Sequence, residues 1–352
     1  MRRKAAVKYL LPLLCGLFVS LACTAESGTD TNGTNAKGAC SADASSVRSA
    51  QGIRMKAEEI TAQTAIESVI LDPDFAPWGR LIFPADSGYW SGTTLGNLKL
   101  TWYSRLDAAK TVEVVRYFKN QTVRGGPVFF DIYTEKEKQL DPRKRDTGLF
   151  FFRGEKGAKT AICSAGGGFA YVGAMHDSFP HALELSKKGY NAFALIYRPG
   201  SQNACEDLAR AVAFIHEHAA ELQIDTADYS LWGGSAGARM AAWLGSRGTE
   251  RFGEKPYPRP AAVIMQYTGL SDLYGSEPPT YACIGTADGI SNWRVMENYI
   301  RKIKANGTDA HIEIFEGLPH GFGLGTGTVA AGWLDNAVKF WERNMRKGFN
   351  KE

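Results

Sequence analysis

Short apolar runs alternate along this chain with segments whose apolar residues recur every three to four positions. Eight runs are typical of β-strands: residues 127–133, 148–152, 159–163, 192–197, 229–232, 262–266, 281–285 and 311–315. Five segments have the periodicity of helices that face a core: residues 178–189, 203–222, 236–247, 291–306 and 330–346. Strands that alternate with helices predict an α/β fold for residues 127–352. We expect a mostly parallel sheet of about eight strands with helices on both faces.

A smaller extension precedes the predicted sheet. Residues 54–66 and 108–123 carry helical periodicity, and an aromatic stretch lies between them, with Trp78, Tyr89, Trp90, Trp102 and Tyr103. We predict that residues 51–126 pack on the core as an N-terminal extension. Its aromatic side chains then either fill ordinary packing positions or overhang a cleft.

The first residues predict export from the cytoplasm. Four basic residues, Arg2, Arg3, Lys4 and Lys8, precede an apolar stretch that is too short to span a bilayer comfortably. This pattern is typical of a signal peptide, which we assign to residues 1–22. The segment 20–23 (Ser-Leu-Ala-Cys) is similar to a lipoprotein cleavage box, so that Cys23 would become the lipidated first residue; cleavage after Ala25 is the alternative.

The segment after the predicted cleavage site has almost nothing to bury. Residues 23–50 are rich in Gly, Ser, Thr, Asn, Asp and Ala, which predicts a flexible spacer between a lipid anchor and the folded part of the chain. The formal charge is +4, and the predicted signal peptide carries four basic residues and no acid, so +4 less 4 leaves 0. This balance argues against nucleic acid as a partner. Contact with a membrane is expected only through the N-terminal anchor.

The cysteine and histidine spacings predict no metal site. The chain has six cysteines but no CxxC pair, no HExxH motif and no acidic metal-binding loop. Cys163 and Cys283 fall in predicted core strands, where a thiol behaves as a small apolar group. An exported protein can form disulfides, but no spacing here specifies one.

The most specific chemical signal is the pentapeptide Gly-Gly-Ser-Ala-Gly at residues 233–237, between a predicted strand and a predicted helix. A strand, a sharp turn and a helix in this pattern form a nucleophile elbow, which holds Ser235 clear of the backbone. Gly233 and Gly237 leave room where strand and helix almost touch, and the positive end of the helix favours a developing oxyanion. The alternative is a glycine-rich turn with an incidental serine.

A second glycine cluster follows an earlier predicted strand. Residues 163–169 (Cys-Ser-Ala-Gly-Gly-Gly-Phe) bring flexible main-chain N–H groups to the expected site. Acyl transfer needs such donors to stabilise the tetrahedral oxyanion. We predict an oxyanion hole from Gly167, with Gly168 beside it, and the N–H of Ala236. A phosphate-binding loop is the alternative, but neither GxGxxG nor a Walker lysine is present.

An acid and a histidine follow the last two predicted strands. Asp288 stands in the loop 286–289 (Thr-Ala-Asp-Gly), and His320 in the loop 317–323 (Gly-Leu-Pro-His-Gly-Phe-Gly). The order Ser, Asp, His is that of the α/β-hydrolase triad. Asp272, one strand earlier, is a rival for the acid, although the setting of Asp288 favours it. The carboxyl ends of parallel strands bring all three side chains to one edge of the sheet.

With these motifs in order, the chain resembles the α/β-hydrolase superfamily. It is most similar to the bacterial acetyl-esterase and lipase-like branch, which includes many acetylated-carbohydrate esterases. The matching segments are residues 163–169, 189–198, 233–237, 278–288 and 317–324, and they span about residues 127–345. The chain departs from relatives that have Pro-Gly-Gly-Gly where it has residues 165–168. It also departs from those with Gly-His where it has Ala238 and Arg239.

The resemblance implies a serine carboxylesterase that needs no cofactor and acts on a small-molecule or glycan ester. About a dozen residues separate the strand ending near residue 266 from the next, which leaves no room for a large lid there. We therefore expect an open site for short acyl groups, with Phe169, Tyr171 and His176 as pocket candidates. A peptidase of the same fold, or a surface binding protein on a hydrolase scaffold, are the alternatives.

Overall fold

The computed structural model describes residues 54–103 and 106–345, all of which belong to one unit, residues 50–352. The predicted signal peptide, the lipidation site at Cys23 and the whole predicted spacer lie outside the described residues. Within the described part, no helix is both long enough and apolar enough to cross a bilayer.

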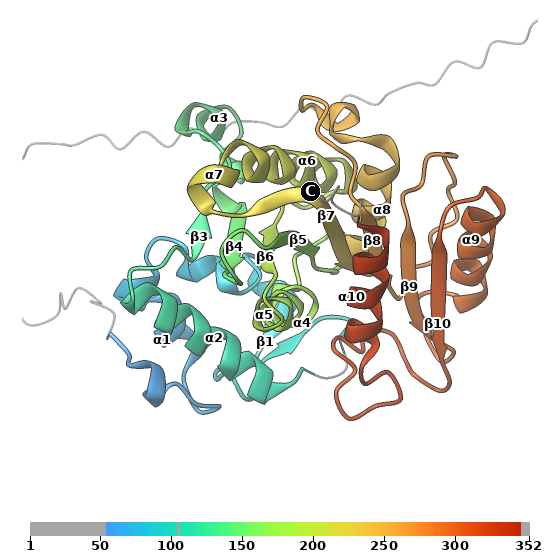
Figure 1. Cartoon of the computed structure of the whole chain (residues 1–352). Helices are drawn as coiled ribbons and strands as arrows, with labels where there is room; N and C mark the ends of the chain where they lie inside the picture. Colours follow the sequence, from blue (N-terminus) through green and yellow to red (C-terminus); the bar gives the residue numbers. More distant parts are fainter. Residues whose placement is uncertain (1–53, 104–105, 346–352) are drawn as a thin grey trace, which may run out of the picture. The chain divides into compact units, whose positions relative to one another are not determined.

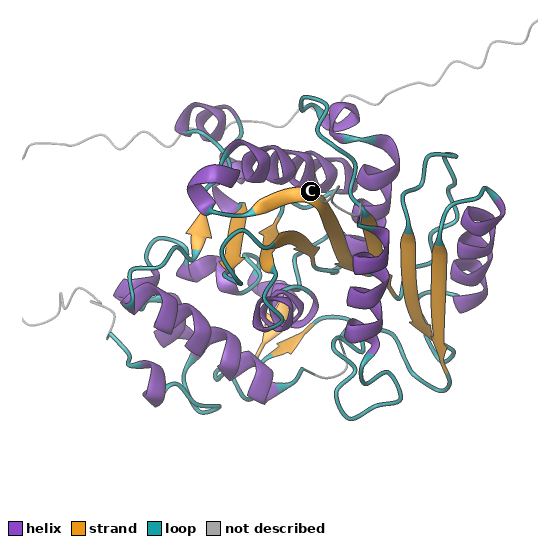
Figure 2. Ribbon diagram, in the orientation of Figure 1, coloured by secondary structure: helices purple, strands orange, loops and turns teal. Residues whose placement is uncertain are grey.

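The core of this unit is an eight-stranded sheet, shown in Figures 1 and 2. Its spatial order is β10-β9-β8-β7-β5-β6-β4-β3. The strands β5 to β10 pair in parallel, whereas β3 and β4 are antiparallel at one edge. The bounds are β3 Phe129–Phe130, β4 Gly148–Phe152, β5 Lys159–Ser164, β6 Asn191–Ile196, β7 Asp225–Gly234, β8 Ala262–Gln266, β9 Thr280–Gly285 and β10 Ala310–Phe315. The predicted fold class is confirmed.

Ten α-helices are described. The long ones are α2 (Ala108–Val123), α5 (Phe179–Lys187), α6 (Ser201–Glu217), α8 (Ala236–Arg247), α9 (Trp293–Ala305) and α10 (Trp333–Asn344). The short ones are α1 (Ile66–Ile70), α3 (Glu135–Leu140), α4 (Ala174–Asp177) and α7 (Ala219–Leu222). The predicted helices 108–123 and 236–247 are found with those bounds. The predicted helix 203–222 is divided into α6 and α7.

The strand register shows why the helices cover both faces. Side chains alternate along a strand, so residues paired across neighbouring strands share a face. One face carries Phe150, Ala194, Cys163 and Trp232 in a row. The ring of Phe150 contacts α5, and that of Trp232 contacts α10. The neighbouring row, with Leu231 and Val263, faces α8, and in Figure 1 the strands lie between α5 and α6.

The extension packs against the α5 face. Its helix α2 contacts α5, and the ring of Trp78 lies 5.9 Å from Phe118 in α2 and 5.5 Å from Phe150 in β4. A buried Lys119 in α2 pairs with Asp72 at 2.7 Å and Asp74 at 2.8 Å, which ties the segment before the hairpin to this helix. The hairpin itself consists of β1 (Trp90–Ser91) and β2 (Lys99–Leu100).

The prediction of one helix over residues 54–66 is wrong. The structure has a single 3-10 turn, Ala57–Glu59, and α1 then begins at Ile66. The hydroxyl of Thr64 accepts from the N–H of Thr61, and the hydroxyl of Thr61 accepts from Gln63. Such local side-chain bonds compete with helical ones, and the carbonyls of Ala62 and Thr64 accept from the hairpin loop instead.

Candidate active site

Ser235 lies on a strained turn between β7 and α8. Its φ of 51° and ψ of −113° are unfavourable for a residue with a side chain, and a hydrogen bond of 3.0 Å from its N–H to the carbonyl of Gln266 helps to hold it there. A Cβ atom at Gly237 would come closer than 3.0 Å to the carbonyl oxygen of Ser164, and one at Gly233 would clash with Gly237. The sequence feature read as a nucleophile elbow therefore has the geometry of one.

Three predicted side chains form one hydrogen-bonded chain. His320 Nε2 lies 3.2 Å from Ser235 Oγ, and His320 Nδ1 lies 2.8 Å from Asp288 Oδ2. The Asp288 side chain is fully buried and that of His320 is 9% exposed. The N–H groups of Ile290 and Ser291 donate to Asp288 Oδ1 at 2.8 and 2.7 Å, which fixes the carboxylate plane. This arrangement can move a proton from the hydroxyl to the imidazole while the carboxylate orients the ring.

The rival acid takes no part in this chain. Asp272 is exposed in the loop after β8, whereas Asp288 follows β9 and contacts the imidazole. Both loops are at the carboxyl edge of the sheet, so only the three-dimensional placement distinguishes them.

The glycine loop after β5 lies against the elbow. A Cβ atom at Gly166 would be 3.0 Å from the carbonyl oxygen of Gly234, and one at Gly237 would clash with Ser164. Gly167 and Gly168 have φ values of 124° and 62°, which few other residues adopt. No described acceptor takes a hydrogen bond from the N–H of Gly167 or Gly168. The N–H of Ala236, at the first position of α8, has no partner within its helix.

A buried carboxylate, that of Asp177, supports the glycine loop and the loop that begins at Tyr267. Asp177 Oδ2 accepts from the hydroxyl of Tyr103 at 2.5 Å and from the N–H of Gly166 at 3.0 Å, and Oδ1 accepts from the hydroxyl of Tyr267. Burial, reinforced by the nearby carboxylate, raises the pKa of Tyr103 and Tyr267 well above the ordinary value, so both phenols stay protonated donors. The ring of Tyr267 lies 4.9 Å from that of His320.

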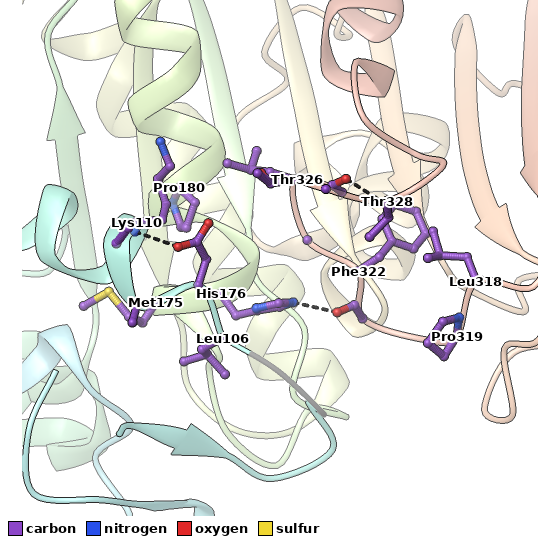
Figure 3. Close-up of a pocket in the computed structure, with 18 of the residues that line it drawn as sticks. Leu106, Lys110, Met175, His176, Pro180, Leu318, Pro319, Phe322, Thr326 and Thr328 are labelled. Atoms are coloured by element: carbon purple, nitrogen blue, oxygen red, sulfur yellow. Dashed lines mark hydrogen bonds between the residues drawn. The ribbon is translucent and has the colours of Figure 1, made fainter. Parts of the chain in front are cut away.

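The predicted pocket residues occupy different places. His176 is buried, its Nε2 lies 2.8 Å from the carbonyl oxygen of Gly321, and it lines a hollow of about 640 Å³ whose wall also includes His320. Figure 3 shows His176 on one wall of this hollow and Leu318 with Pro319 on the facing one. Tyr171 is buried and its ring is stacked on Tyr89 at 4.8 Å. Phe169 is half-buried, and neither Phe169 nor Tyr171 borders the hollow.

No cluster of metal-ligating side chains accompanies these groups. Among residues 54–103 and 106–345, no three His, Cys, Asp or Glu side chains come together in a way that would hold a metal ion. The described cysteines, Cys163, Cys205 and Cys283, are buried and free, and burial raises the pKa of the Cys205 thiol to about 12.

Comparison with known proteins agrees with this fold. The BD-FAE family model matches residues 153–280, which include the glycine loop and Ser235. An acetyl ester-xyloside bifunctional hydrolase from Caldicellulosiruptor lactoaceticus is 21% identical, with a TM-score of 0.55 over 61% of this chain and 95% of its own. A propionate-bound esterase of Thermogutta terrifontis is 20% identical, with a TM-score of 0.51 over 62% and 96%. No curated protein matches the chain.

The sheet order and these solved structures show that this protein has an α/β-hydrolase fold. Sequence reasoning missed the supporting role of Asp177, Tyr103 and Tyr267, although it placed Asp177 near the cleft. Their signals were weak: Tyr103 stood in the aromatic stretch of the extension, and Tyr267 directly followed a predicted strand.

Proposed function

We propose that this protein is a serine carboxylesterase that hydrolyses short-chain acyl esters, with acetyl groups on carbohydrates as the expected substrates. The observation that carries the proposal is the continuous chain from Ser235 Oγ through His320 to the buried Asp288, at 3.2 and 2.8 Å. A hydroxyl on a strained turn, an imidazole and a carboxylate in this order supply a nucleophile, a general base and its orienting group.

In this mechanism Ser235 Oγ attacks the ester carbonyl while His320 Nε2 takes its proton. The N–H groups of Gly167 and Ala236, with Gly168 beside them, stabilise the oxyanion of the tetrahedral intermediate. The intermediate collapses, His320 returns the proton to the alcohol oxygen, and an acyl-enzyme remains on Ser235. A water molecule, deprotonated by His320, then releases the acid. No step needs a cofactor.

The preference for short acyl groups rests on the loop between β8 and β9. This loop is only residues 267–279, and its buried Tyr267 bonds to Cys283 in β9 and to Asp177. No lid of the size that encloses a long acyl chain can form from it. The carbohydrate part of the proposal rests on the sequence resemblance to acetylated-carbohydrate esterases.

A series of p-nitrophenyl esters tests the acyl preference. We expect the highest kcat/KM for acetate or propionate, and best turnover at eight carbons or longer would contradict the proposal. Ser235→Ala is expected to abolish turnover and labelling by a fluorophosphonate probe. Ser201→Ala, which changes an exposed serine at the start of α6, serves as the matched control and is expected to retain both. A wild-type protein that stays unlabelled would instead be a binding protein.

We also propose that the enzyme is exported and held at a membrane by a lipid on Cys23, with residues 23–50 as a spacer. The support is the basic and apolar pattern of residues 1–22. Expression of the full chain in a bacterial host tests this. The wild type is expected in the membrane fraction, and Cys23→Ser is expected to shift it to the soluble fraction; an unchanged distribution would contradict the anchor.

A further inference from the structure

Trp102 combines an exposed side chain with a strained backbone. Its side chain is 52% exposed, and its φ of 70° lies in the left-handed region. An exposed residue of this size normally relaxes to an ordinary φ, because burial does not reward the strained conformation. Among the described residues, six other than glycine have a left-handed φ, and four of them surround the site: Trp102, Phe169, Ser235 and Tyr267.

The residues on either side hold Trp102 in this conformation. The carbonyl of Thr101 accepts a hydrogen bond from the hydroxyl of Tyr171, and the N–H of Thr101 donates to the carbonyl of Tyr89 at 2.9 Å. On the other side, the hydroxyl of Tyr103 donates to the buried Asp177. The backbone is thus fixed at both neighbours. The indole ring packs on Tyr89 and Tyr171, with ring centroids 6.1 and 5.7 Å apart, and the rest of it is exposed.

The segment of Trp102 and Tyr103 contacts two loops of the site. A Cβ atom at Gly168 would lie 2.9 Å from Trp102 Cζ3, and one at Gly321 would lie 2.9 Å from Tyr103 Cδ1. Residues 102–103 therefore bridge the oxyanion loop and the loop that carries His320. Because His320 returns its proton to the alcohol oxygen, the alcohol half of the ester must leave beside this bridge.

A second aromatic residue adjoins the exposed Gly168. Phe169 also has a left-handed φ, of 61°, and its carbonyl accepts from the N–H of Gly200 at 2.8 Å. Its ring stacks on Trp243 with centroids 5.9 Å apart and an interplanar angle of 10°. Trp102 and Phe169 thus border the same glycine, and the extension contributes one while the core contributes the other.

We propose that Trp102 is the platform that binds the pyranose ring of the alcohol half of the ester. A pyranose has an apolar C–H face, which packs on an indole, and a rim of hydroxyl groups that stays hydrated at an exposed site. A long alkyl chain gains little from one half-exposed ring, because most of its surface would remain in water. This inference rests on the proposed esterase activity.

Two acetate esters with different alcohols test the platform: a mono-acetylated methyl xyloside, and ethyl acetate, which has no ring to stack. The test variants are Trp102→Asn, which removes the ring but tolerates a left-handed φ, and Trp102→Tyr, which keeps an aromatic ring. For Trp102→Asn we expect KM for the xyloside to rise roughly tenfold with little change in kcat, and kcat/KM for ethyl acetate to stay within about twofold. Trp102→Tyr is expected to stay within about threefold on both.

The outcomes distinguish this inference from the proposed esterase activity on which it rests. An equal loss on both esters in Trp102→Asn would show a structural role and overturn the platform, as would unchanged kinetics on both. Hydrolysis of ethyl acetate but not of the xyloside by the wild type would also overturn it, while the esterase proposal would stand. Hydrolysis of neither ester would refute the esterase proposal itself.

Discussion

Asp288→Asn replaces one carboxylate oxygen by an amide group and tests the proton path. Two N–H groups, of Ile290 and Ser291, point at Oδ1 at 2.8 and 2.7 Å, so the amide oxygen must take that position. The opposite orientation would point the NH₂ group at these two donors and lose both hydrogen bonds, at about 0.5–1.5 kcal/mol each. The amide NH₂ therefore faces His320 Nδ1, which lies 2.8 Å from Oδ2 in the wild type.

The consequence is a change of tautomer. A ring nitrogen that faces an NH₂ group must accept, so the proton of His320 moves to Nε2, the atom 3.2 Å from Ser235 Oγ. A protonated Nε2 cannot take the serine proton. In a serine protease triad the same change lowers kcat by about 10⁴. We expect kcat/KM to fall by roughly 10³–10⁴ here, which corresponds to about 4–5.5 kcal/mol.

The assay is steady-state hydrolysis of p-nitrophenyl acetate at pH 7.5, with thermal unfolding as a check on the fold. Asp272→Asn is the matched control, because the sequence offers this exposed residue as the alternative acid of the triad, and His320 bonds to Asp288 instead. We expect Asp272→Asn to stay within about twofold of the wild type. Two results would refute the reasoning: Asp288→Asn keeping more than a tenth of the wild-type activity, or Asp272→Asn losing more than nine tenths of it.

Three further predictions concern stability. Asp177→Ala leaves three buried donors unpaired, so we expect the free energy of unfolding to fall by at least about 3 kcal/mol. Asp177→Asn keeps an acceptor and is expected to lose about half as much. Equal losses of the two variants in urea unfolding would contradict this. Gly237→Ala forces a methyl group against the Ser164 carbonyl, so we expect it to lower the free energy of unfolding by about 1–3 kcal/mol and to remove most of the activity. Gly88→Ala meets only the Asp86 side chain and is expected to keep both stability and activity. Burial lowers the pKa of His181 from 6.5 to about 4, so the unfolded chain takes up the proton first and stability is lost as the pH falls from 6.5 towards 4. Between pH 7.5 and 4 the wild type should lose about 3 kcal/mol more than His181→Leu, and parallel pH profiles would exclude this histidine as the cause.

Most of the sheet and the three residues of the chain from Ser235 to Asp288 followed from local sequence. Buried strands are continuous apolar runs, so β4 and β8 have their predicted bounds. The elbow and the loops that follow β9 and β10 have turn residues at fixed places relative to those strands, and the sheet order then brings their carboxyl ends together.

The support for the site could not be predicted in the same way. Asp177 is 74 residues from Tyr103 and 90 from Tyr267, and no local pattern indicates that these three side chains meet. Their contact depends on the extension closing over the glycine loop. The helix expected over residues 54–66 failed for a related reason, because its carbonyls accept hydrogen bonds from a hairpin about thirty residues away.

Mapping the residue that a fluorophosphonate modifies tests the central claim most directly. The account predicts one phosphonyl group per chain, on the peptide that carries Ser235, with esterase activity lost in proportion to labelling. Ser235→Ala should remain unlabelled. A label on another residue, or full activity after complete labelling of Ser235, would contradict the account.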